Sequence, residues 1–405
     1  MTESVSLIVG SDPWAFAVPA DRRLPLDRVT EPTRSSAPAT LMADALERPF
    51  GLTVPLRRAV TPDDHAVILV DERLPHLAEI LVPLLEHLRL AGIDPANITL
   101  LVPPQSRDQR WVEELPDELG DVHIEVHAPD NREKIAYLAT TKGERRVYLN
   151  RKIVEAELPI ILSGRGFDPR VGYSGGAAFL FPQFSDAETL AAYAKEFSTA
   201  KRPEEPNALR TEAKEILKLL GAPFLVQVIE GPGDSIAEVL VGLPSASSEG
   251  VRLMKERWFG RVRRKADLVI AAISGTPERI GFRELATAMA AAGRVLEPNG
   301  RIVLLTAAAP PLDDSGDLLL KVDEPAAALK RIAKAKPDDA MPGTFWAYAA
   351  KKARLFVASG WPDELVEELF ATPVRNAAEV QRLIDAAGGV LFLQDAHKMS
   401  IEVGA

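Results

Sequence analysis

Two short apolar runs, separated by a segment of helical periodicity, constrain the fold of this chain more than any other feature. Residues 66–70 form an uninterrupted apolar run, and residues 98–102 form a second one broken only by Thr99; both have the length and composition of buried parallel strands. Between them, residues 77–91 place apolar side chains at helical spacing despite Pro83 and end at Gly92, a frequent C-terminal signal of helices. A strand, a helix and a strand in this order predict a right-handed βαβ unit.

The same alternation continues along the chain and predicts an α/β protein. Further runs with the character of strands lie at residues 122–126, 147–150, 158–162, 224–228, 268–272, 301–305 and 390–393. A predicted helix at 247–259 and a basic stretch at 261–265 separate an N-terminal from a C-terminal series. We therefore expect two α/β domains with a cleft between them, at residues 1–255 and 262–395, with a hinge near 250–265 and a tail at 396–405.

The composition excludes several classes of function. The 405 residues carry a formal net charge of −10, so the chain lacks the basic balance that nucleic-acid binding or attachment to an anionic membrane requires. The absence of cysteine excludes disulfides, thiolate catalysis and Cys-ligated metal centres. Neither a signal peptide nor an apolar run of about 18 residues is evident, so we expect a cytoplasmic protein whose partner is a small molecule.

A glycine-rich loop at residues 164–176 follows the predicted strand 158–162 and precedes a predicted helix. Adjacent glycines allow the backbone to approach a ligand closely, and N–H groups at a helix start favour anions. The turn at Asp71 and the turn at 103–107 also follow predicted strands. Ligands bind at the carboxyl edge of open α/β sheets, so we expect a ligand cleft here. The alternative is that these loops are only connections.

Several residues in these loops are candidates for binding an anion or for catalysis. Guanidinium groups bind carboxylates and phosphates through paired donors, and backbone N–H groups can complete such a site. The candidate ligand-binding residues are Ser106, Arg107, Arg170, Ser174, Gly175 and Gly176. The alternative for the arginines is a salt bridge between the domains to an acidic residue such as Glu284. Asp71 and Glu284 are candidate catalytic residues, and Asp71 could instead cap the following helix.

The six histidines do not form a predicted metal site. His123 and His127 have the i, i+4 spacing of helical metal ligands, but they flank a predicted strand, and His127 precedes a turn. His76 follows Pro75 near the expected cleft, where it could contact a ligand or simply be solvated.

The glycine loop resembles the Gly-Phe-Ser-Gly-Gly loop of the nickel-dependent lactate racemases, the LarA-like family. Other motifs extend the resemblance over most of the chain: Ala-Leu-x-x-Pro at 45–49, the Asp71 turn, which is similar to the family's Asp-x-Thr-Arg-Pro motif, and Gly275-x-Pro277-Glu278. The resemblance implies LarA-like N-terminal and C-terminal α/β domains around an inter-domain cleft. It also implies a racemase or epimerase acting on hydroxy acids with a nickel-pincer nucleotide.

The departures from the family concentrate at the residues to which the family assigns its chemistry. Ala178 occupies the position of the family's lysine that carries the cofactor. Arg170 replaces the family's histidine after the proline, and Ser106 replaces a second histidine of the family. In addition, the family's Gln-x-x-Lys becomes Glu284-x-x-Thr287, and its histidine near residues 193–194 is missing.

These departures predict a scaffold that has lost nickel-pincer chemistry, holds neither cofactor nor metal, and keeps an anion-binding cleft for a binding or regulatory role. The alternative is an active hydroxy-acid or sugar-acid racemase or epimerase with a relocated site that uses Asp71, Arg170 and Glu284.

Overall fold

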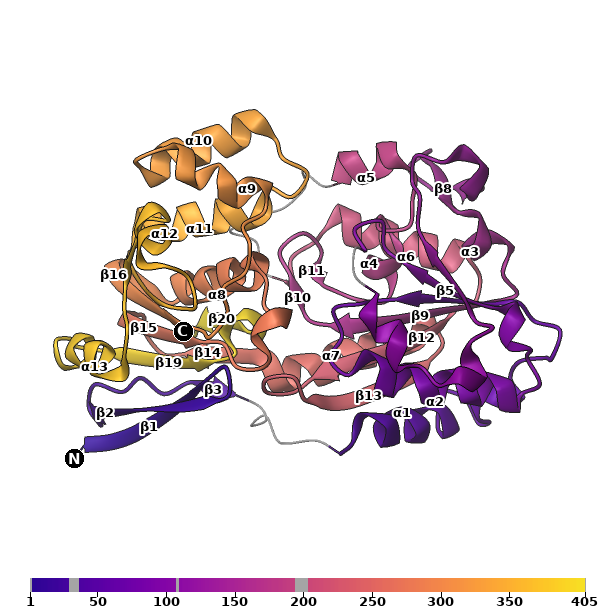
Figure 1. The fold of residues 1–405 in the computed structure, drawn as a ribbon, viewed down its shortest axis with the longest axis horizontal. Coiled ribbons are helices and arrows are strands. Elements are labelled where there is room, and N and C mark those ends of the chain that lie inside the picture. The colour runs from indigo at the N-terminus through magenta and orange to yellow at the C-terminus, as the bar shows by residue number, and fades with distance from the viewer. Residues whose placement is uncertain (1, 29–35, 107–108, 194–202, 405) are drawn as a thin grey trace. The chain divides into compact units, whose positions relative to one another are not determined.

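The computed structural model describes residues 2–28, 36–106, 109–193 and 203–404. The chain forms two compact units, which are coloured along the sequence in Figure 1. Unit 1 comprises residues 1–31, 232–234 and 256–405, and unit 2 comprises residues 32–231 and 235–255.

The N-terminal residues belong with the C-terminal part of the chain, which differs from the expected boundaries. Strands β1 (Thr2–Val9) and β2 (Asp12–Pro19) form an antiparallel hairpin. The buried face of this hairpin, which includes Val5 and Phe16, packs in one apolar cluster with the main sheet of unit 1. The segment 396–405 also differs from a tail, because β20 (Ser400–Val403) pairs in parallel with β14 (Phe259–Val262).

The sheet of unit 2 has the strand order β13-β12-β9-β4-β5-β6, in which only β13 runs antiparallel to its neighbour. The predicted βαβ unit is present as β4, α2 and β5, and both of these strands are buried along their full length. The strands are β4 (Ala66–Val70), β5 (Ile98–Val102), β6 (His123–Val126), β9 (Leu158–Arg165), β12 (Phe224–Glu230) and β13 (Ile236–Gly242). The chain proceeds outward from β4 to β6 and then continues on the other side of β4 with β9, so the direction of winding changes between β4 and β9.

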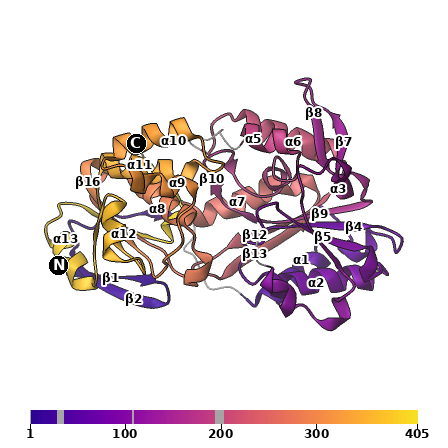
Figure 2. The same cartoon turned by 45° about the horizontal axis from the view of Figure 1, so that its top comes forward.

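Helices cover both faces of this sheet. On one face, α1 (Pro38–Glu47) and α2 (Leu77–Leu90) bury leucines and isoleucines against alternate strand residues. On the other face, α4 (Ala177–Leu180) and α6 (Ala208–Leu219) form a second apolar cluster with the sheet. Three further helices belong to this unit: α3 (Arg151–Glu155), α5 (Ala187–Tyr193) and α7 (Ser247–Trp258). Strands β7 (Ile135–Thr140) and β8 (Arg146–Asn150) form a hairpin that extends outward in Figure 2. Strands β10 (Phe167–Asp168) and β11 (Gly172–Tyr173) form a short antiparallel pair.

Unit 1 is built on a five-stranded parallel sheet with the order β18-β17-β16-β15-β19. Its strands are β15 (Ala266–Ala272), β16 (Leu296–Leu305), β17 (Arg354–Ala358), β18 (Ala371–Pro373) and β19 (Val390–Gln394). A smaller sheet joins β20, β14 and β3 (Asp27–Arg28). The helices are α8 (Phe282–Arg294), α9 (Asp314–Asp317), α10 (Pro325–Ala335), α11 (Met341–Lys352), α12 (Asp363–Glu368) and α13 (Ala377–Asp385).

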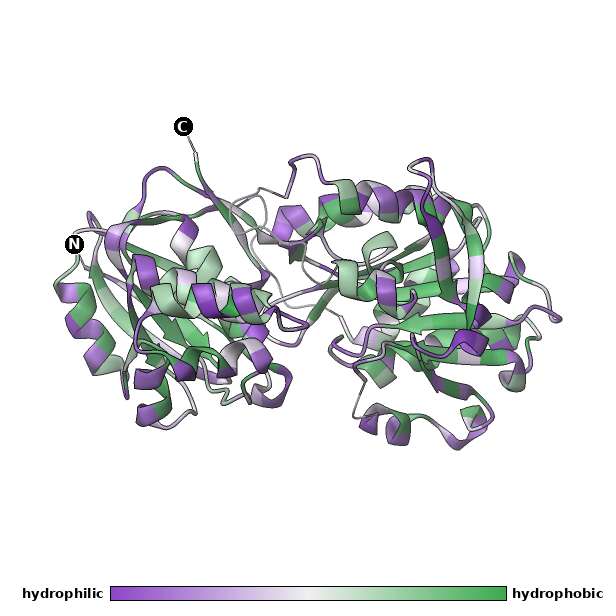
Figure 3. Ribbon diagram, turned by 90° about the horizontal axis from the view of Figure 1, so that it is seen from above, coloured by the Kyte–Doolittle hydropathy of each residue, from purple (hydrophilic) through white to green (hydrophobic). Residues whose placement is uncertain are grey.

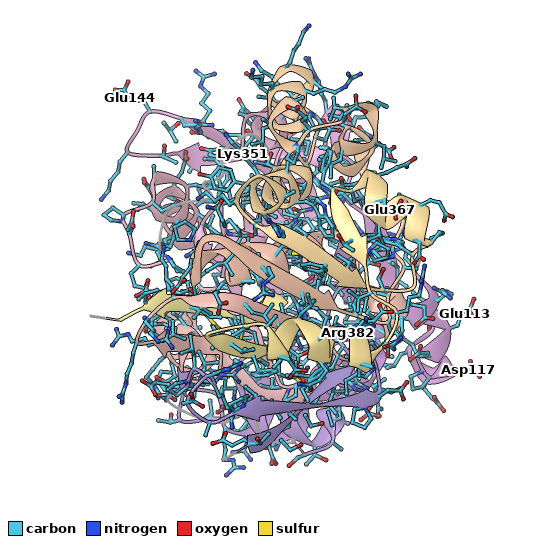
Figure 4. The ribbon with its side chains drawn as sticks, turned by 90° about the vertical axis from the view of Figure 1, so that its left-hand side faces the viewer. Glu113, Asp117, Glu144, Lys351, Glu367 and Arg382 are labelled. Atoms are coloured by element: carbon cyan, nitrogen blue, oxygen red, sulfur yellow. The ribbon has the colours of Figure 1, made fainter. Side chains whose placement is uncertain are left out.

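The distribution of polarity follows this layering. The central strands are mostly hydrophobic in Figure 3, whereas the helices alternate hydrophobic and hydrophilic residues, as helices that cover a sheet do. Among the charged side chains labelled in Figure 4, Glu113, Asp117 and Glu144 lie at the outline of the molecule and are exposed. Within the described ranges, no helix is long and apolar enough to cross a membrane.

A buried histidine ties the first helices of unit 2 together. The backbone N–H of Arg57 donates to Nε2 of His87 at 2.9 Å, so Nδ1 carries the proton of the neutral ring. Nδ1 lies 3.8 Å from a carboxylate oxygen of Glu47. Burial, and then the charge of Arg57, lower the pKa of His87 to about 4. The folded protein therefore resists protonation of this ring, because a proton on Nε2 would displace the hydrogen bond from Arg57.

We predict that the stability of unit 2 falls as the pH is lowered from 7 to 4.5. An unfolded His87 takes up a proton near its ordinary pKa of 6.5, whereas the folded one does so only near 4. Protons therefore bind the unfolded state more strongly between pH 7 and pH 4.5, and the free energy of unfolding falls by on the order of 2 kcal/mol. His87→Gln keeps a hydrogen-bond acceptor without titrating, so its thermal unfolding midpoint should depend less on pH. An equal loss of stability in both proteins would contradict the role of His87.

Candidate functional site

The change of winding direction in unit 2 brings Asp71 and the glycine loop together. Asp71 directly follows β4, and residues 163–165 are the last of the neighbouring strand β9. The backbone N–H of Asp71 donates to the carbonyl of Leu162 at 3.0 Å, and that of Gly164 donates to a carboxylate oxygen of Asp71 at 3.4 Å. In open α/β sheets this position, outside the carboxyl ends of the strands where winding reverses, is where ligands bind.

The Asp71 carboxylate is buried and holds its own turn. Its side chain accepts from Nε of Arg73 at 3.0 Å, from Nη2 of Arg73 at 3.3 Å and from the backbone N–H of Arg73 at 3.3 Å. Asp71 does not cap helix α2, whose N-cap is His76. The carboxylate instead links the Arg73 turn to the end of β9 at Gly164.

The glycine loop folds back on the end of β9 in a conformation that depends on Gly175 and Gly176. Both have positive φ angles, +77° and +56°. A Cβ atom on Gly175 would collide with the carbonyl oxygen of Gly164, and one on Gly176 would lie 2.8 Å from Nη2 of Arg165. The N–H of Gly176 donates to Oγ of Ser163 at 2.8 Å, which fixes the second glycine against the strand. Ser174 joins the same fold through a bond from its N–H to the carbonyl of Gly166 at 2.9 Å.

Arg165 is a functional candidate that the sequence reasoning missed. Its Nε donates to Oε1 of Gln227 at 2.7 Å, and its Nη1 donates to the carbonyls of Ser174 at 2.9 Å and Gly175 at 3.0 Å. Its Nη2 donates to Oγ of Ser247 at 2.7 Å. The side chain is buried, and burial lowers its pKa to about 10. The signal in the sequence was a charged residue between two glycines at the end of an apolar strand.

Arg170 has a partner within its own loop. Its Nη2 lies 3.4 Å from a carboxylate oxygen of Asp168, and its backbone N–H donates to the other carboxylate oxygen at 2.7 Å. The alternative partner named from sequence, Glu284, lies in unit 1 near the start of α8. There it accepts from the backbone N–H of Gly281 at 3.0 Å and so caps its own helix.

The other predicted residues of this edge have local contacts. Ser106 follows β5, and its Oγ accepts from Nε2 of Gln109 at 3.3 Å. Arg107 lies outside the described residues. Ala178 is the second residue of the four-residue helix α4. His76 has a left-handed backbone, and its Nδ1 lies 2.7 Å from a carboxylate oxygen of Glu79.

The two histidines of helical spacing do not face a common site. His127 is buried, donates from Nε2 to the carbonyl of Ser185 at 2.8 Å, and accepts at Nδ1 from Asn150 at 3.2 Å. Its pKa is lowered, chiefly by burial. His123 is largely exposed and lies 3.9 Å from Glu125. Across the described ranges, no group of three His, Cys, Asp or Glu side chains is arranged to hold a metal ion.

In unit 1, the side chain of Asp395 ties together the equivalent edge between β15 and β19. The buried Asp395 accepts from the N–H of Ser274 at 2.9 Å, from Oγ of Ser274 at 2.7 Å and from the N–H of Gly233 at 3.0 Å. Burial would raise the pKa of Asp395, but nearby Lys398 and these hydrogen bonds hold it below its ordinary value. Gly10 also pairs there, through bonds to Ile273 and Gly275. We therefore assign the candidate site to unit 2.

We predict that Gly175→Ala disrupts the loop. The added methyl group would collide with the Gly164 carbonyl, and alanine is strained at positive φ, so the variant should lose roughly 1–3 kcal/mol of stability. Gly221→Ala is the matched control, because Gly221 has a φ of +101° but open space around its Cβ position. Hydrogen exchange should rise across residues 164–180 only in Gly175→Ala. Similar protection of this segment in both variants would refute the assigned packing.

Comparisons with known proteins agree with this architecture. Residues 9–205 match the family described as the lactate racemase N-terminal domain. The lactate racemase of Thermoanaerobacterium thermosaccharolyticum is 22% identical over 367 residues, which cover 84% of this chain and 84% of that protein. The solved apoprotein of lactate racemase from this organism superposes with a TM-score of 0.79 at 17% identity, covering 98% of this chain and 100% of that one. A Thermotoga maritima protein superposes with a TM-score of 0.63 at 12% identity, covering 92% and 100%.

Proposed function

The chain belongs to the lactate racemase (LarA-like) family, and from that premise we propose that it binds a small anion at the glycine loop of unit 2 without nickel-pincer chemistry. The observation that carries this proposal is the pairing of a buried, cationic Arg165 with the retained Ser174-Gly175-Gly176 turn at the reversal of winding. The biological role we propose is binding or regulatory. A cytoplasmic location, and a small anion rather than nucleic acid or a membrane as partner, belong to the same proposal.

The residues present do not fit the nickel-pincer cofactor that the family resemblance implies. Covalent attachment through a lysine needs an amine, and Ala178 offers only a methyl group. A guanidinium has donors and no lone pair for a metal ion, so Arg170 cannot replace a histidine ligand. Ser106 is a poor general base and already accepts a hydrogen bond from Gln109. We derive no reaction step through this cofactor.

Positive charge around the loop favours an anion. The guanidinium of Arg210 donates to the backbone carbonyls of Val171, Pro203 and Glu205, and within the described ranges it forms no ion pair with a carboxylate. The pKa of Lys214 is lowered by partial burial and then by repulsion from Arg210, Arg165 and Lys218. Such mutual repulsion is relieved when an anion binds nearby. The net charge of −10 does not oppose this, since charges act over about 8 Å at physiological salt.

The alternative of an active racemase is favoured by one observation, the buried Asp71 carboxylate at the reversal of winding. However, both of its oxygens already accept hydrogen bonds, from Arg73 and Gly164. Glu284 likewise caps its own helix. Racemisation of a 2-hydroxy acid by hydride transfer needs an acceptor that no side chain provides. Binding without this chemistry is therefore the better-supported function.

We predict that Arg170→Ala weakens binding of inorganic phosphate or of a small carboxylate by about 10- to 100-fold, the value of a charge-assisted hydrogen bond. Asp168→Asn is the matched variant. An asparagine at this position retains the acceptor for the loop N–H groups but releases the Arg170 guanidinium, so binding should be maintained or tightened. Titration calorimetry and thermal shift with phosphate, lactate, sugar acids and nucleotides measure both. If no anion stabilises the wild type, or all three proteins respond equally, the proposed function is wrong.

We predict that the protein carries no stoichiometric nickel and does not racemise lactate. It should be produced beside the enzymes that make the nickel-pincer nucleotide, because only then could loading occur. Intact mass and metal analysis should show no adduct, since Ala178 has no amine. The T. thermosaccharolyticum lactate racemase, prepared in parallel, is the positive control. Interconversion of D- and L-lactate above background by this chain would overturn the prediction.

A further inference from the structure

We infer that Arg165 is the positioning residue of this anion site: it shapes the glycine loop through neutral oxygens only and leaves an uncompensated positive charge behind the loop. This inference rests on the proposed function, and it adds the group that makes the loop a receptor for anions. It also predicts which anions bind best, namely those of higher negative charge, such as a phosphate dianion over a monocarboxylate.

The guanidinium joins three separate segments. It reaches from the end of β9 to the loop carbonyls of Ser174 and Gly175, to Gln227 on β12, and to Ser247 at the start of α7. Gln227 is itself oriented, because its Nε2 donates to the carbonyl of Ala246 at 3.1 Å and so turns Oε1 toward Arg165. The loop therefore rests on a side chain whose own direction is fixed from two sides.

The charge of Arg165 is not cancelled locally. Four of the five N–H groups of the guanidinium have acceptors, and each is an amide, carbonyl or hydroxyl oxygen. In the described part of the chain, no carboxylate forms an ion pair or hydrogen bond with it, and burial is what lowers its pKa. A buried charge is costly unless an opposite charge accompanies it. An anion bound on the outer side of the loop would supply this missing negative charge, and the protein between them would screen its attraction to Arg165 only weakly.

A structural role accounts for the hydrogen bonds of Arg165 but not for a charge that has no opposite charge beside it. Replacing a buried charge by an apolar side chain of similar size is often neutral or stabilising, so packing alone gives no reason for an arginine. Arg210 provides a comparison, because it too donates to carbonyls near the loop but is partly exposed to solvent. Solvent screens its charge, whereas the charge of the buried Arg165 is screened little.

The decisive experiment neutralises the charge without removing the side chain that holds the loop. Gln227→Glu places a carboxylate against Nε of Arg165 in nearly the same shape, while it removes the hydrogen bond that Nε2 of Gln227 donates to the carbonyl of Ala246. Binding of inorganic phosphate, measured by calorimetry, should weaken at least tenfold and lose part of its salt dependence. Hydrogen exchange across residues 164–180 should stay as in the wild type, because the bonds of Arg165 to the loop remain. Asn131→Asp, which adds the same charge at an exposed turn, should leave binding unchanged.

Two substitutions of Arg165 separate its charge from its shape. Arg165→Met should weaken phosphate binding and raise exchange in the loop. Arg165→Lys should raise exchange as well, since it cannot reach all the acceptors, but it should recover part of the affinity. Should Arg165→Met fail to fold, Gln227→Glu and Arg165→Lys carry the test.

The outcomes distinguish this inference from the proposed function. If the wild type binds phosphate and Gln227→Glu binds it equally well, Arg165 does not supply the charge and the inference fails alone. Equal weakening in Arg165→Lys and Arg165→Met would also overturn it, because the role would then be structural. If the wild type binds neither phosphate nor any other anion, the proposed function fails and the inference falls with it.

Discussion

The candidate site depends on the pairing of β4 with β9 in the sheet of unit 2. Because winding reverses between these two strands, the helices that follow them lie on opposite faces of the sheet, α2 on one and α4 and α6 on the other. Asp71, just after β4, meets Gly164 near the end of β9. The hydrogen bond from the N–H of Asp71 to the carbonyl of Leu162 extends the ladder by one step beyond β4. At this junction the turn at Arg73 contacts Asp71, and the loop of Gly175 and Gly176 contacts β9.

The function we propose for this junction relies on fixed positive charge and needs no proton transfer. Where the related racemases are expected to hold histidine and lysine, this chain has an arginine paired with an aspartate, a serine and an alanine. Histidine can carry or release a proton near neutral pH, but a guanidinium stays charged. In the proposed function these substitutions leave an edge suited to recognition, while the glycine geometry that lets a ligand approach is kept.

The fold could be predicted where the signal is local. The apolar runs at 66–70 and 98–102 and the helix between them became β4, α2 and β5, because buried parallel strands need continuous apolar sequence. The loop of Gly175 and Gly176 was also recognisable, since positive φ angles favour glycine. The assignment of β1 and β2 to unit 1 was not, because an amphipathic hairpin does not reveal which sheet it covers. Arg165 was missed because its role depends on contacts that are distant in the sequence: its partners Gln227 and Ser247 lie 62 and 82 residues away.

The order in which the units can form follows from how the chain is divided between them. Unit 2 is complete once residue 255 has been synthesised, whereas unit 1 needs both its first 31 residues and strands β19 and β20 near the end. During translation, the hairpin β1–β2 must therefore wait, with its apolar face uncovered, until almost the whole chain has left the ribosome. Release of the nascent chain before β19 is complete would therefore leave the apolar face of the hairpin without the sheet that covers it.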